Sequence, residues 1–177
     1  PNVQQTYMVG GKPWTPRNAN RRRYGQMVTL KWGLAQSNNW ISAYLMSRLN
    51  PRQFVNILHK FGINNPDIYP SMSLCLGPCE VSVGEMVSAY TTFANNGIRI
   101  APMFVTKIED NEGNVVAEFQ PRMNGGITSA CAYKMLVELM AVVDERTAGR
   151  LRFRYHIPGE IGGKTGTTNR NSDAWFM

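Results

Sequence analysis

The fold is decided by residues 162–168, which read Gly162-Gly163-Lys164-Thr165-Gly166-Thr167-Thr168. One interpretation is a phosphate-binding loop, which needs another glycine five residues before its Gly-Lys-Thr. Pro158 occupies that position, and Gly159 comes one residue too late. A phosphate loop must also open a helix, whereas here a polar turn and then a strand-like run follow. We therefore exclude nucleotide binding at this stretch.

The same residues are similar to the Lys-Thr-Gly strand of serine acyl-transferases that act on penicillins. Lys164 would place a cation beside a site, and the hydroxyls of Thr165 and Thr167 can hydrogen-bond a substrate carboxylate. Gly166 has no side chain, so a peptide can approach the backbone closely and pair with a free strand edge. A basic residue beside a glycine-rich turn could have the same sequence without forming an active site, so a second motif is needed.

The second motif is Ser37-Asn38-Asn39, which interrupts two predicted helices at 28–36 and 40–49. A Ser-x-Asn triplet can serve the same active site. It can also be a helix cap, because Ser and Asn both accept hydrogen bonds from free N–H groups. Both interpretations stay open on this triplet alone.

Three stretches in order resemble the transpeptidase domain of a class A (bifunctional) penicillin-binding protein. They are Gly25 to Asn39, Leu76 to Gly97, and Gly162 to Thr168 with Asp173 to Phe176, and together they cover nearly the whole chain. The resemblance implies an α+β fold of the penicillin-binding transpeptidase and β-lactamase type, with helices packed on an antiparallel sheet. We expect that sheet to be cut at both chain ends.

The resemblance also implies roles for individual residues. The predicted catalytic residues are Ser37, as a proton relay, Asn39, which would hold the substrate amide, and Lys164, which would support Ser37. The predicted substrate-binding residues are Thr165, Gly166, Thr167 and Thr168. Of these, Thr165 and Thr167 would bind a carboxylate, and the Thr167 N–H would be an oxyanion-hole donor. No metal and no organic cofactor is implied.

The chain departs from the family in one respect. The family's nucleophile lies in a Ser-x-x-Lys motif, and no serine here is followed by Lys three residues later. We expect that motif upstream of Pro1, and we expect this chain to be a fragment that forms no acyl-enzyme alone. Loss of a nucleophile costs on the order of a millionfold in rate.

The resemblance implies a parent enzyme that cross-links peptidoglycan stem peptides by attack on their D-Ala–D-Ala bond, and that β-lactams acylate. The parent would carry an upstream glycosyltransferase domain and a membrane anchor, and would face the periplasm; the fragment itself is expected to be soluble. Two alternatives remain: a D,D-carboxypeptidase or β-lactamase of the same fold, and a non-catalytic peptidoglycan-binding module.

Composition is that of a globular protein, with 43% hydrophobic and 18% charged residues and a net charge of +7. The basic runs at 21–23 and 150–154 are far apart in sequence and carry no nucleic-acid motif, so we expect no nucleic-acid partner. The cysteines lack metal-ligand spacing, and we expect buried thiols at Cys75, Cys79 and Cys131.

The predicted organisation has three parts: an irregular lead-in at 1–27, a mainly helical segment at 28–144 with a hairpin at 102–119, and active-site strands at 159–177. Asn50-Pro51 predicts a helix start, and Ser82 to Glu85 a capping box. A polar turn is expected at Asn169 to Asn171. Because a cut sheet leaves unpaired edges, copies of the chain are expected to associate through them.

Overall fold

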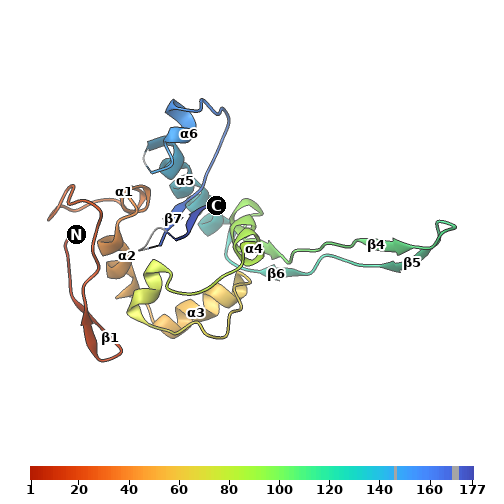
Figure 1. Ribbon diagram of the computed structural model, residues 1–177, viewed down its shortest axis with the longest axis horizontal. Helices are drawn as coiled ribbons and strands as arrows, with labels where there is room; N and C mark the ends of the chain where they lie inside the picture. The colour runs from red at the N-terminus through yellow and green to blue at the C-terminus, as the bar shows by residue number, and fades with distance from the viewer. Residues whose placement is uncertain (146, 169–171) are drawn as a thin grey trace.

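The computed structural model describes residues 1–145, 147–168 and 172–177. A body of helices carries a long two-stranded arm, which projects to the right in Figure 1. The helices are α1 (Leu30–Ala35), α2 (Asn39–Met46), α3 (Pro51–Lys60), the 3-10 helix η1 (Met72–Leu76), α4 (Val83–Ala94), α5 (Ser129–Glu145) and α6 (Arg150–Phe153). The strands are β1 (Tyr7–Val9), β2 (Lys12–Trp14), β3 (Ile98–Ile100), β4 (Lys107–Glu109), β5 (Val115–Glu118), β6 (Met123–Gly125), β7 (Thr165–Thr167) and β8 (Ala174–Phe176).

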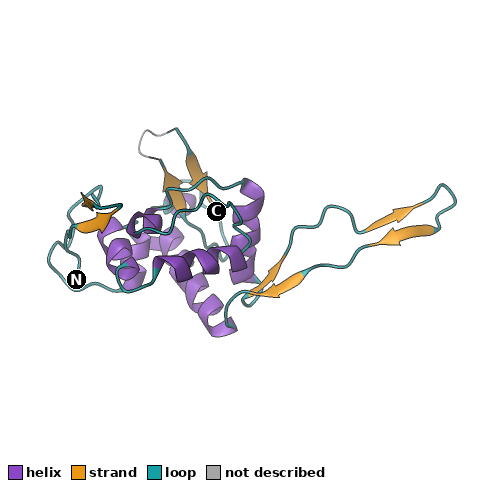
Figure 2. Ribbon diagram, turned by 90° about the horizontal axis from the view of Figure 1, so that it is seen from below, coloured by secondary structure: helices purple, strands orange, loops and turns teal. Residues whose placement is uncertain are grey.

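The strands confirm the α+β class and the antiparallel pairing. In the described part of the chain they form four separate two-stranded sheets: β1–β2, β3–β6, β4–β5 and β7–β8. Two of these are successive parts of the arm, residues 98–125 (Figure 2). The arm's ladder is interrupted between them, where Pro102 on one side and Pro121 on the other have no backbone N–H to donate.

The expected hairpin at 102–119 is correct at its tip and wrong at its base. The turn closes at Gly113, with φ +86°, and Asp110 Oδ1 accepts the N–H groups of Glu112 and Asn114 at 2.9 Å each. Regular strand begins only at Lys107, because the proline at 102 removes a ladder donor. The sequence also missed the β3–β6 pairing, which lies outside the expected range.

The lead-in at 1–27 is less irregular than expected, because β1 and β2 form a tight hairpin within it. Gly10 and Gly11 supply the positive φ angles of the turn, +55° and +76°. The rings of Tyr7 and Trp14 pack across the two strands at 6.2 Å between centroids. The sequence did not predict β2, because Pro13 lies within it. Proline is nevertheless tolerated at a sheet edge.

Helix starts follow the sequence signals closely. Asn50 caps α3, with Pro51 at its first position, and Ser82 with Glu85 forms the predicted capping box of α4. Helix α5 begins after Thr128, whose hydroxyl accepts the N–H of Cys131 at 3.3 Å. Helix α6 and the 3-10 helix η1 were not predicted. The expected turn at 169–171 lies outside the described residues.

Two apolar clusters form the core of the body. One joins η1 and α4 to the end of α2 and the segment after α3, and its buried members are Met46, Phe61, Ile63, Ile68, Leu74 and Ala89. The other is built on Val142 and Val143 of α5, and Leu34 of α1 and Ile161 pack against it. This second cluster fixes the end of α1, just before Ser37, and the segment that leads into Lys164.

Two glycines let the last strands approach the core. A Cβ atom on Gly163 would lie 2.5 Å from the carbonyl oxygen of Met177, and one on Gly162 would lie 3.3 Å from Leu139 Cβ. The Gly163 N–H also donates to Leu139 O at 3.2 Å. The glycine pair thus lets residues 162–163, which lead into β7, pass close to α5. Among the described helices, none combines the length and the apolar character that a membrane span requires.

Candidate active site

The two sequence motifs meet at one point. Lys164 Nζ donates to Ser37 Oγ at 3.0 Å, although the residues are 127 positions apart. Nζ also donates to Thr165 O at 2.7 Å. A hydroxyl that accepts a hydrogen bond from an ammonium group keeps its own proton free for another acceptor. The pair can therefore deliver or receive a proton at Ser37.

Ser37 lies in the sharp turn between α1 and α2. Its φ of +51° is in the left-handed region, which costs a non-glycine residue about 1–2 kcal/mol. The turn is held by backbone bonds from Ser37 N to Leu34 O and from Asn38 N to Gly33 O, both at 2.9 Å. The side chain of Ser37 is exposed, so this conformation presents the hydroxyl to the surface beside Lys164.

Lys164 is anchored through its backbone to the C-terminal strand region. Its N–H donates to Met177 O at 2.8 Å, and its carbonyl accepts the N–H of Met177 at 3.2 Å. Burial lowers the pKa of its ammonium group, because the charged form is less well solvated. A lysine with a lowered pKa gives up its proton more readily, which suits a group that exchanges protons with Ser37.

Strand β7 carries three of the predicted substrate-binding residues, Thr165, Gly166 and Thr167. It pairs with β8 in the register Thr165↔Phe176, Gly166↔Trp175 and Thr167↔Ala174. Within the described residues, no strand pairs with its opposite edge. A Cβ atom on Gly166 would have only Trp175 Cβ nearby, at 4.0 Å. Packing within this part of the chain therefore does not require a glycine at position 166.

Thr165 is half-buried, and Gly166, Thr167 and Thr168 are exposed. The hydroxyl of Thr168 is engaged locally: it accepts the N–H of Asp173 at 3.0 Å and lies 2.9 Å from Ser172 Oγ. These bonds give Thr168 a role in closing the β7–β8 turn. Substrate binding by β7 remains a prediction.

Asn39 is the first residue of α2, and the lead-in orients it. Its N–H donates to Asn18 Oδ1 at 2.7 Å, and its Nδ2 donates to Arg17 O at 2.6 Å. In the same segment, Pro16 O accepts the indole N–H of Trp40 at 3.0 Å. Nothing in the sequence pattern singled out residues 16–18, because their contacts span more than twenty positions.

The helix-cap interpretation of the triplet also holds, but for Asn38. Its Oδ1 accepts the N–H groups of Trp40 and Ile41 at 3.0 and 3.1 Å, which caps α2. Its side chain is buried, while that of Ser37 faces Lys164. The helix-cap interpretation is therefore confirmed for Asn38, and the active-site roles of Ser37 and Asn39 stay a prediction.

The cysteines are free thiols in the structure. Burial raises the pKa of the Cys75 thiol to about 11, so it stays protonated at neutral pH. Cys75 and Cys79 are only half-buried and Cys131 is exposed, which corrects the expectation of three buried thiols. In the part of the chain that the structure describes, no three His, Cys, Asp or Glu side chains gather into a set that could hold a metal.

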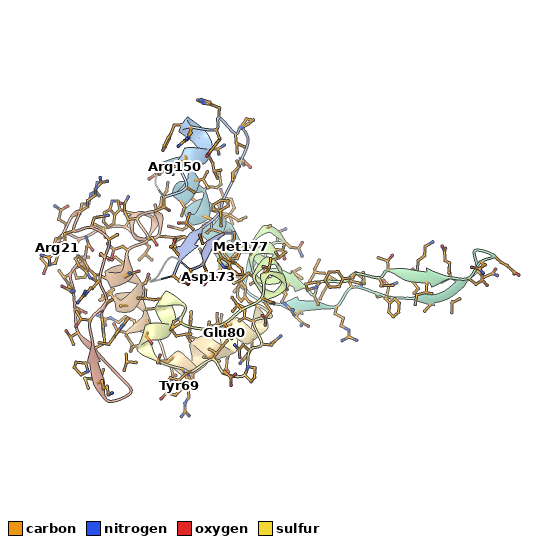
Figure 3. All side chains as sticks on the ribbon, viewed as in Figure 1. Arg21, Tyr69, Glu80, Arg150, Asp173 and Met177 are labelled. Atoms are coloured by element: carbon orange, nitrogen blue, oxygen red, sulfur yellow. The ribbon has the colours of Figure 1, made fainter. Side chains whose placement is uncertain are left out.

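The two basic runs of the sequence lie in different parts of the structure. Figure 3 shows Arg21 beside the N-terminal segment and Arg150 at the far end of α5 and α6. Arg152 forms an ion pair with Asp144, with 2.8 Å between Nε and Oδ1.

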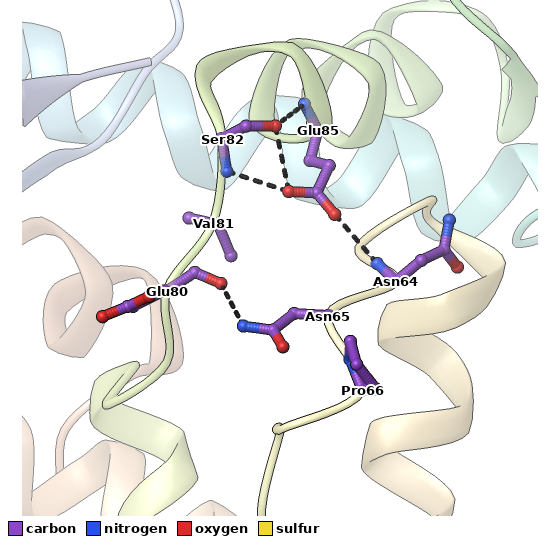
Figure 4. Close-up of a pocket in the computed structure, with 7 residues that line it drawn as sticks. All are labelled: Asn64, Asn65, Pro66, Glu80, Val81, Ser82 and Glu85. Carbon is purple, nitrogen blue, oxygen red and sulfur yellow. Dashed lines mark hydrogen bonds between the residues drawn. The ribbon is translucent and has the colours of Figure 1, made fainter.

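A hollow also lies at the start of α4, and it shares no residue with the Ser37–Lys164 pair. Its polar groups satisfy one another, as Figure 4 shows. Glu85 Oε1 accepts the N–H of Asn64 at 3.0 Å, Glu85 Oε2 accepts that of Ser82 at 2.8 Å, and Asn65 Nδ2 donates to Glu80 O at 2.9 Å. These bonds tie the loop after α3 to the start of α4.

Comparison with known proteins agrees with this geometry. Residues 2–176 match the model of the penicillin binding protein transpeptidase domain. Penicillin-binding protein 1A of Neisseria lactamica is 31% identical over 94% of the chain, and that of Aquifex aeolicus is 35% identical over 94%. The chain spans only 21% and 22% of these relatives.

Solved structures give the same result for the fold. The crystal structure of penicillin-binding protein 1A from Haemophilus influenzae covers 99% of the chain with a TM-score of 0.87 at 25% identity, and the chain covers 32% of it. Penicillin-binding protein A of Mycobacterium tuberculosis, solved as an imipenem acyl-enzyme complex, covers 97% with a TM-score of 0.78 at 18% identity, and the chain covers 43% of it. The chain therefore belongs to the penicillin-binding protein transpeptidase domain family, as part of such a domain of the class A type.

Proposed function

We propose that this chain supplies the proton-relay and substrate-strand part of a serine D,D-transpeptidase site that cross-links peptidoglycan stem peptides. The observation that carries the proposal is the 3.0 Å hydrogen bond from Lys164 Nζ to Ser37 Oγ, beside a strand whose outer edge has no partner among the described residues. An extended peptide can add to such an edge through main-chain hydrogen bonds.

In this proposal, the serine of a Ser-x-x-Lys motif attacks the D-Ala–D-Ala carbonyl and forms an ester, and the terminal D-Ala leaves as an amine. Ser37 passes the nucleophile's proton to that amine, because Lys164 occupies the acceptor side of its hydroxyl. The hydroxyls of Thr165 and Thr167 bind the substrate carboxylate. An amine of a neighbouring stem peptide then attacks the ester and releases the serine.

Asn39 holds the substrate amide in this scheme. Its Nδ2 is oriented by Arg17 O, which turns the side chain in a fixed direction. The backbone N–H of Thr167 donates to the oxyanion that forms during attack. Removing one such donor typically costs about 100- to 1,000-fold in rate.

The chain alone forms no acyl-enzyme in this proposal, because its sequence holds no Ser-x-x-Lys motif. The test is fluorescent penicillin labelling of the full-length protein beside the 177-residue chain. The full-length protein is expected to label, and its Ser37→Ala variant to label far more slowly. Stoichiometric labelling of the short chain at Ser37 would show that this serine is itself the nucleophile, and would overturn the assigned roles.

A D,D-carboxypeptidase or β-lactamase of the same fold is the alternative enzyme, and a non-catalytic binding module is the alternative non-enzyme. The similarity to penicillin-binding proteins 1A favours the transpeptidase. Incubating full-length protein with a D-Ala–D-Ala peptide and an amine acceptor separates the three. Cross-linked product supports the transpeptidase, free hydrolysed peptide supports the hydrolase, and neither product supports the binding module.

For the full-length protein we propose the setting that the class A resemblance implies. It would carry an upstream glycosyltransferase domain and a membrane anchor, and would work on the periplasmic face of the bacterial cytoplasmic membrane. Its ligands would be stem peptides and β-lactams. Nucleic acid is not among the proposed partners, because the basic runs are far apart in sequence and carry no nucleic-acid motif.

We also propose that copies of the 177-residue chain associate through strand edges. The arm consists of two-stranded sheets, and β7 has an unpartnered edge among the described residues, so N–H and C=O groups are free to pair with another copy. Sedimentation velocity is expected to show species above the monomer mass of 19.9 kDa. A monomer at all concentrations would refute the association.

A further inference from the structure

We propose that Asn2 and Asn38 are positioning residues of this active site: a buried amide pair that ties the Ser37 turn to residues 22–26. The kinetic part of this inference rests on the proposed function. The structural part, that the pair holds Ser37 against Lys164, rests on geometry alone and can be tested separately.

The pair is a fully satisfied polar contact within the body. Asn2 is 0% exposed and Asn38 is 6% exposed. Asn38 Nδ2 donates to Asn2 Oδ1 at 2.9 Å, while Asn38 Oδ1 caps α2. Asn2 Nδ2 donates to the carbonyls of Arg22 and Arg23 at 2.8 and 3.0 Å. In each side chain, both the amide oxygen and the amide nitrogen are therefore hydrogen-bonded. Deleting either side chain leaves buried polar atoms unpaired.

The loop that receives Asn2 is itself braced. Asn2 N donates to Gln26 O at 2.9 Å, and Gly25 N donates to Asn2 O at 3.0 Å. Arg23 has a φ of +53°, in the left-handed region, in the stretch whose carbonyls accept from Asn2. The loop thus holds its carbonyl groups in place to accept hydrogen bonds from the Asn2 amide.

Aromatic contacts dock this loop on both helices that flank Ser37. The Arg23 guanidinium lies over the Trp32 ring of α1, 5.5 Å from its centroid. The Tyr24 ring meets the Trp40 ring of α2 edge-on, at 5.5 Å between centroids. Loop 22–26 therefore bridges α1 and α2, and the amide pair connects that bridge to the residue directly after Ser37.

Ser37 depends on this support because it makes little contact of its own. Its side chain is exposed, and its φ is unfavourable for serine. The strain persists only if the neighbouring residues hold the turn, and Asn38 is the neighbour with buried bonds on both sides. A displacement of about 1 Å can cost on the order of 100-fold in rate, so the pair influences catalysis without touching substrate.

Asn2→Ala is the informative variant, because it breaks the link to Asn38 and leaves the cap of α2 intact. The direct readout is the titration of the Lys164 side chain by NMR in the 177-residue chain. Burial lowers the pKa of Lys164, so loosening the Ser37 turn is expected to admit water and move that pKa up toward the ordinary lysine value. Asn38→Ala is expected to do the same.

Asn65→Ala is the matched control. Asn65 also connects two loops, with Nδ2 donating to Glu80 O and Oδ1 accepting from Asp67 N, but it lies in the hollow beside α4. Its loss is expected to leave the titration of Lys164 unchanged. If Asn2→Ala does not give the parent circular dichroism spectrum, Asn2→Ser replaces it, since its side chain is too short to bridge both partners.

In the full-length protein, Asn2→Ala is expected to slow penicillin acylation about 10- to 100-fold, with the loss in the acylation rate constant and not in the dissociation constant of the first complex. A normal acylation rate in a folded Asn2→Ala protein, with Lys164 titrating as in the parent, would overturn the inference. A shifted Lys164 in a protein that never reacts with penicillin would uphold the positioning role and refute the proposed function instead.

Discussion

The body and the arm of this molecule use their apolar residues in opposite ways. In α5, Leu139 is 3% exposed and Val142 and Val143 are 0% exposed. On the arm, residues 98–125, Phe104 is 95% exposed and Val116 is 67% exposed. The body has apolar clusters with fully buried members, and the cluster on α5 helps to bring two distant motifs together. Within the described residues, the arm buries few of its own, so it does not position the site.

This difference shows what precise placement of the Ser37–Lys164 pair requires. The Ser37–Lys164 contact is between partly exposed side chains, and contacts of that kind stabilise a protein little by themselves. Its geometry comes from the apolar cluster on α5 behind Lys164 and from the buried Asn2–Asn38 amides behind Ser37. The arm has hydrogen-bonded strands but no comparable interior.

The largest expected effect is on activity. In the full-length protein, Lys164→Ala or Ser37→Ala is expected to slow penicillin acylation by about 100- to 10,000-fold, the usual contribution of a proton-transfer group. Lys107→Ala is the control, because Lys107 is an exposed lysine of the arm paired only with Glu109. Stopped-flow acylation measures all three. Equal losses for Lys107 and Lys164 would show that the arm takes part in the chemistry.

The next effect concerns stability. Leu139→Ala in α5 is expected to lower the free energy of unfolding by about 2–5 kcal/mol, because it opens a cavity in the core. Val116→Ala on the arm is expected to change it by less than about 0.5 kcal/mol, since the side chain is already exposed. Urea unfolding of the 177-residue chain measures both. A large loss at Val116 would mean that the arm packs against something in solution, such as a second copy.

Local sequence rules predicted most of the body. The caps at Asn50 and Ser82 each depend on hydrogen bonds made within a few residues. The boundaries of β4 were wrong, because the interruption of the arm depends on how two prolines from different strands align. Helix α6 was missed because it is only four residues long, too short for a periodic pattern.

The site was predictable only where a motif existed. Ser37, Asn39 and Lys164 lie in recognisable sequence motifs, and the structure brings Ser37 and Lys164 into contact. Asn2, Arg17 and Asn18 lie in no such motif. Their role depends on contacts across more than twenty residues. The sequence of a proline- and glycine-rich segment does not reveal whether an asparagine in it is buried or exposed to solvent.

A smaller effect is expected from the cap of α4. Ser82→Ala removes the hydroxyl that accepts the Glu85 N–H at 3.2 Å and is expected to lower the free energy of unfolding by about 1 kcal/mol. Thermal unfolding followed by circular dichroism measures it. Ser71→Ala is the matched control, because Ser71 precedes η1 but makes no side-chain cap bond there. Equal losses at both serines would show that the cap bond is not the cause.

The smallest expected effect compares two carboxylates as the pH falls. Bonds from the N–H groups of Ser82 and Asn64 lower the pKa of Glu85 in the body, and bonds from Asn114 lower that of Asp110 at the tip of the arm. A lowered folded pKa stabilises the protein above the unfolded value, and this stabilisation disappears as the pH falls through the folded pKa. Glu85→Gln is therefore expected to flatten the loss of stability below the ordinary glutamate pKa of about 4.3.

Asp110→Asn is expected to leave that acid limb of global unfolding unchanged, although NMR would still show the wild-type Asp110 titrating below its usual range. The reason is that the tip of the arm can open locally while the body stays folded. Urea unfolding between about pH 3 and pH 6 spans the ordinary carboxyl range and compares the two variants. If Asp110→Asn alters the global free energy as much as Glu85→Gln does, the arm and the body unfold as one unit, and the contrast in burial between them does not reflect a contrast in stability.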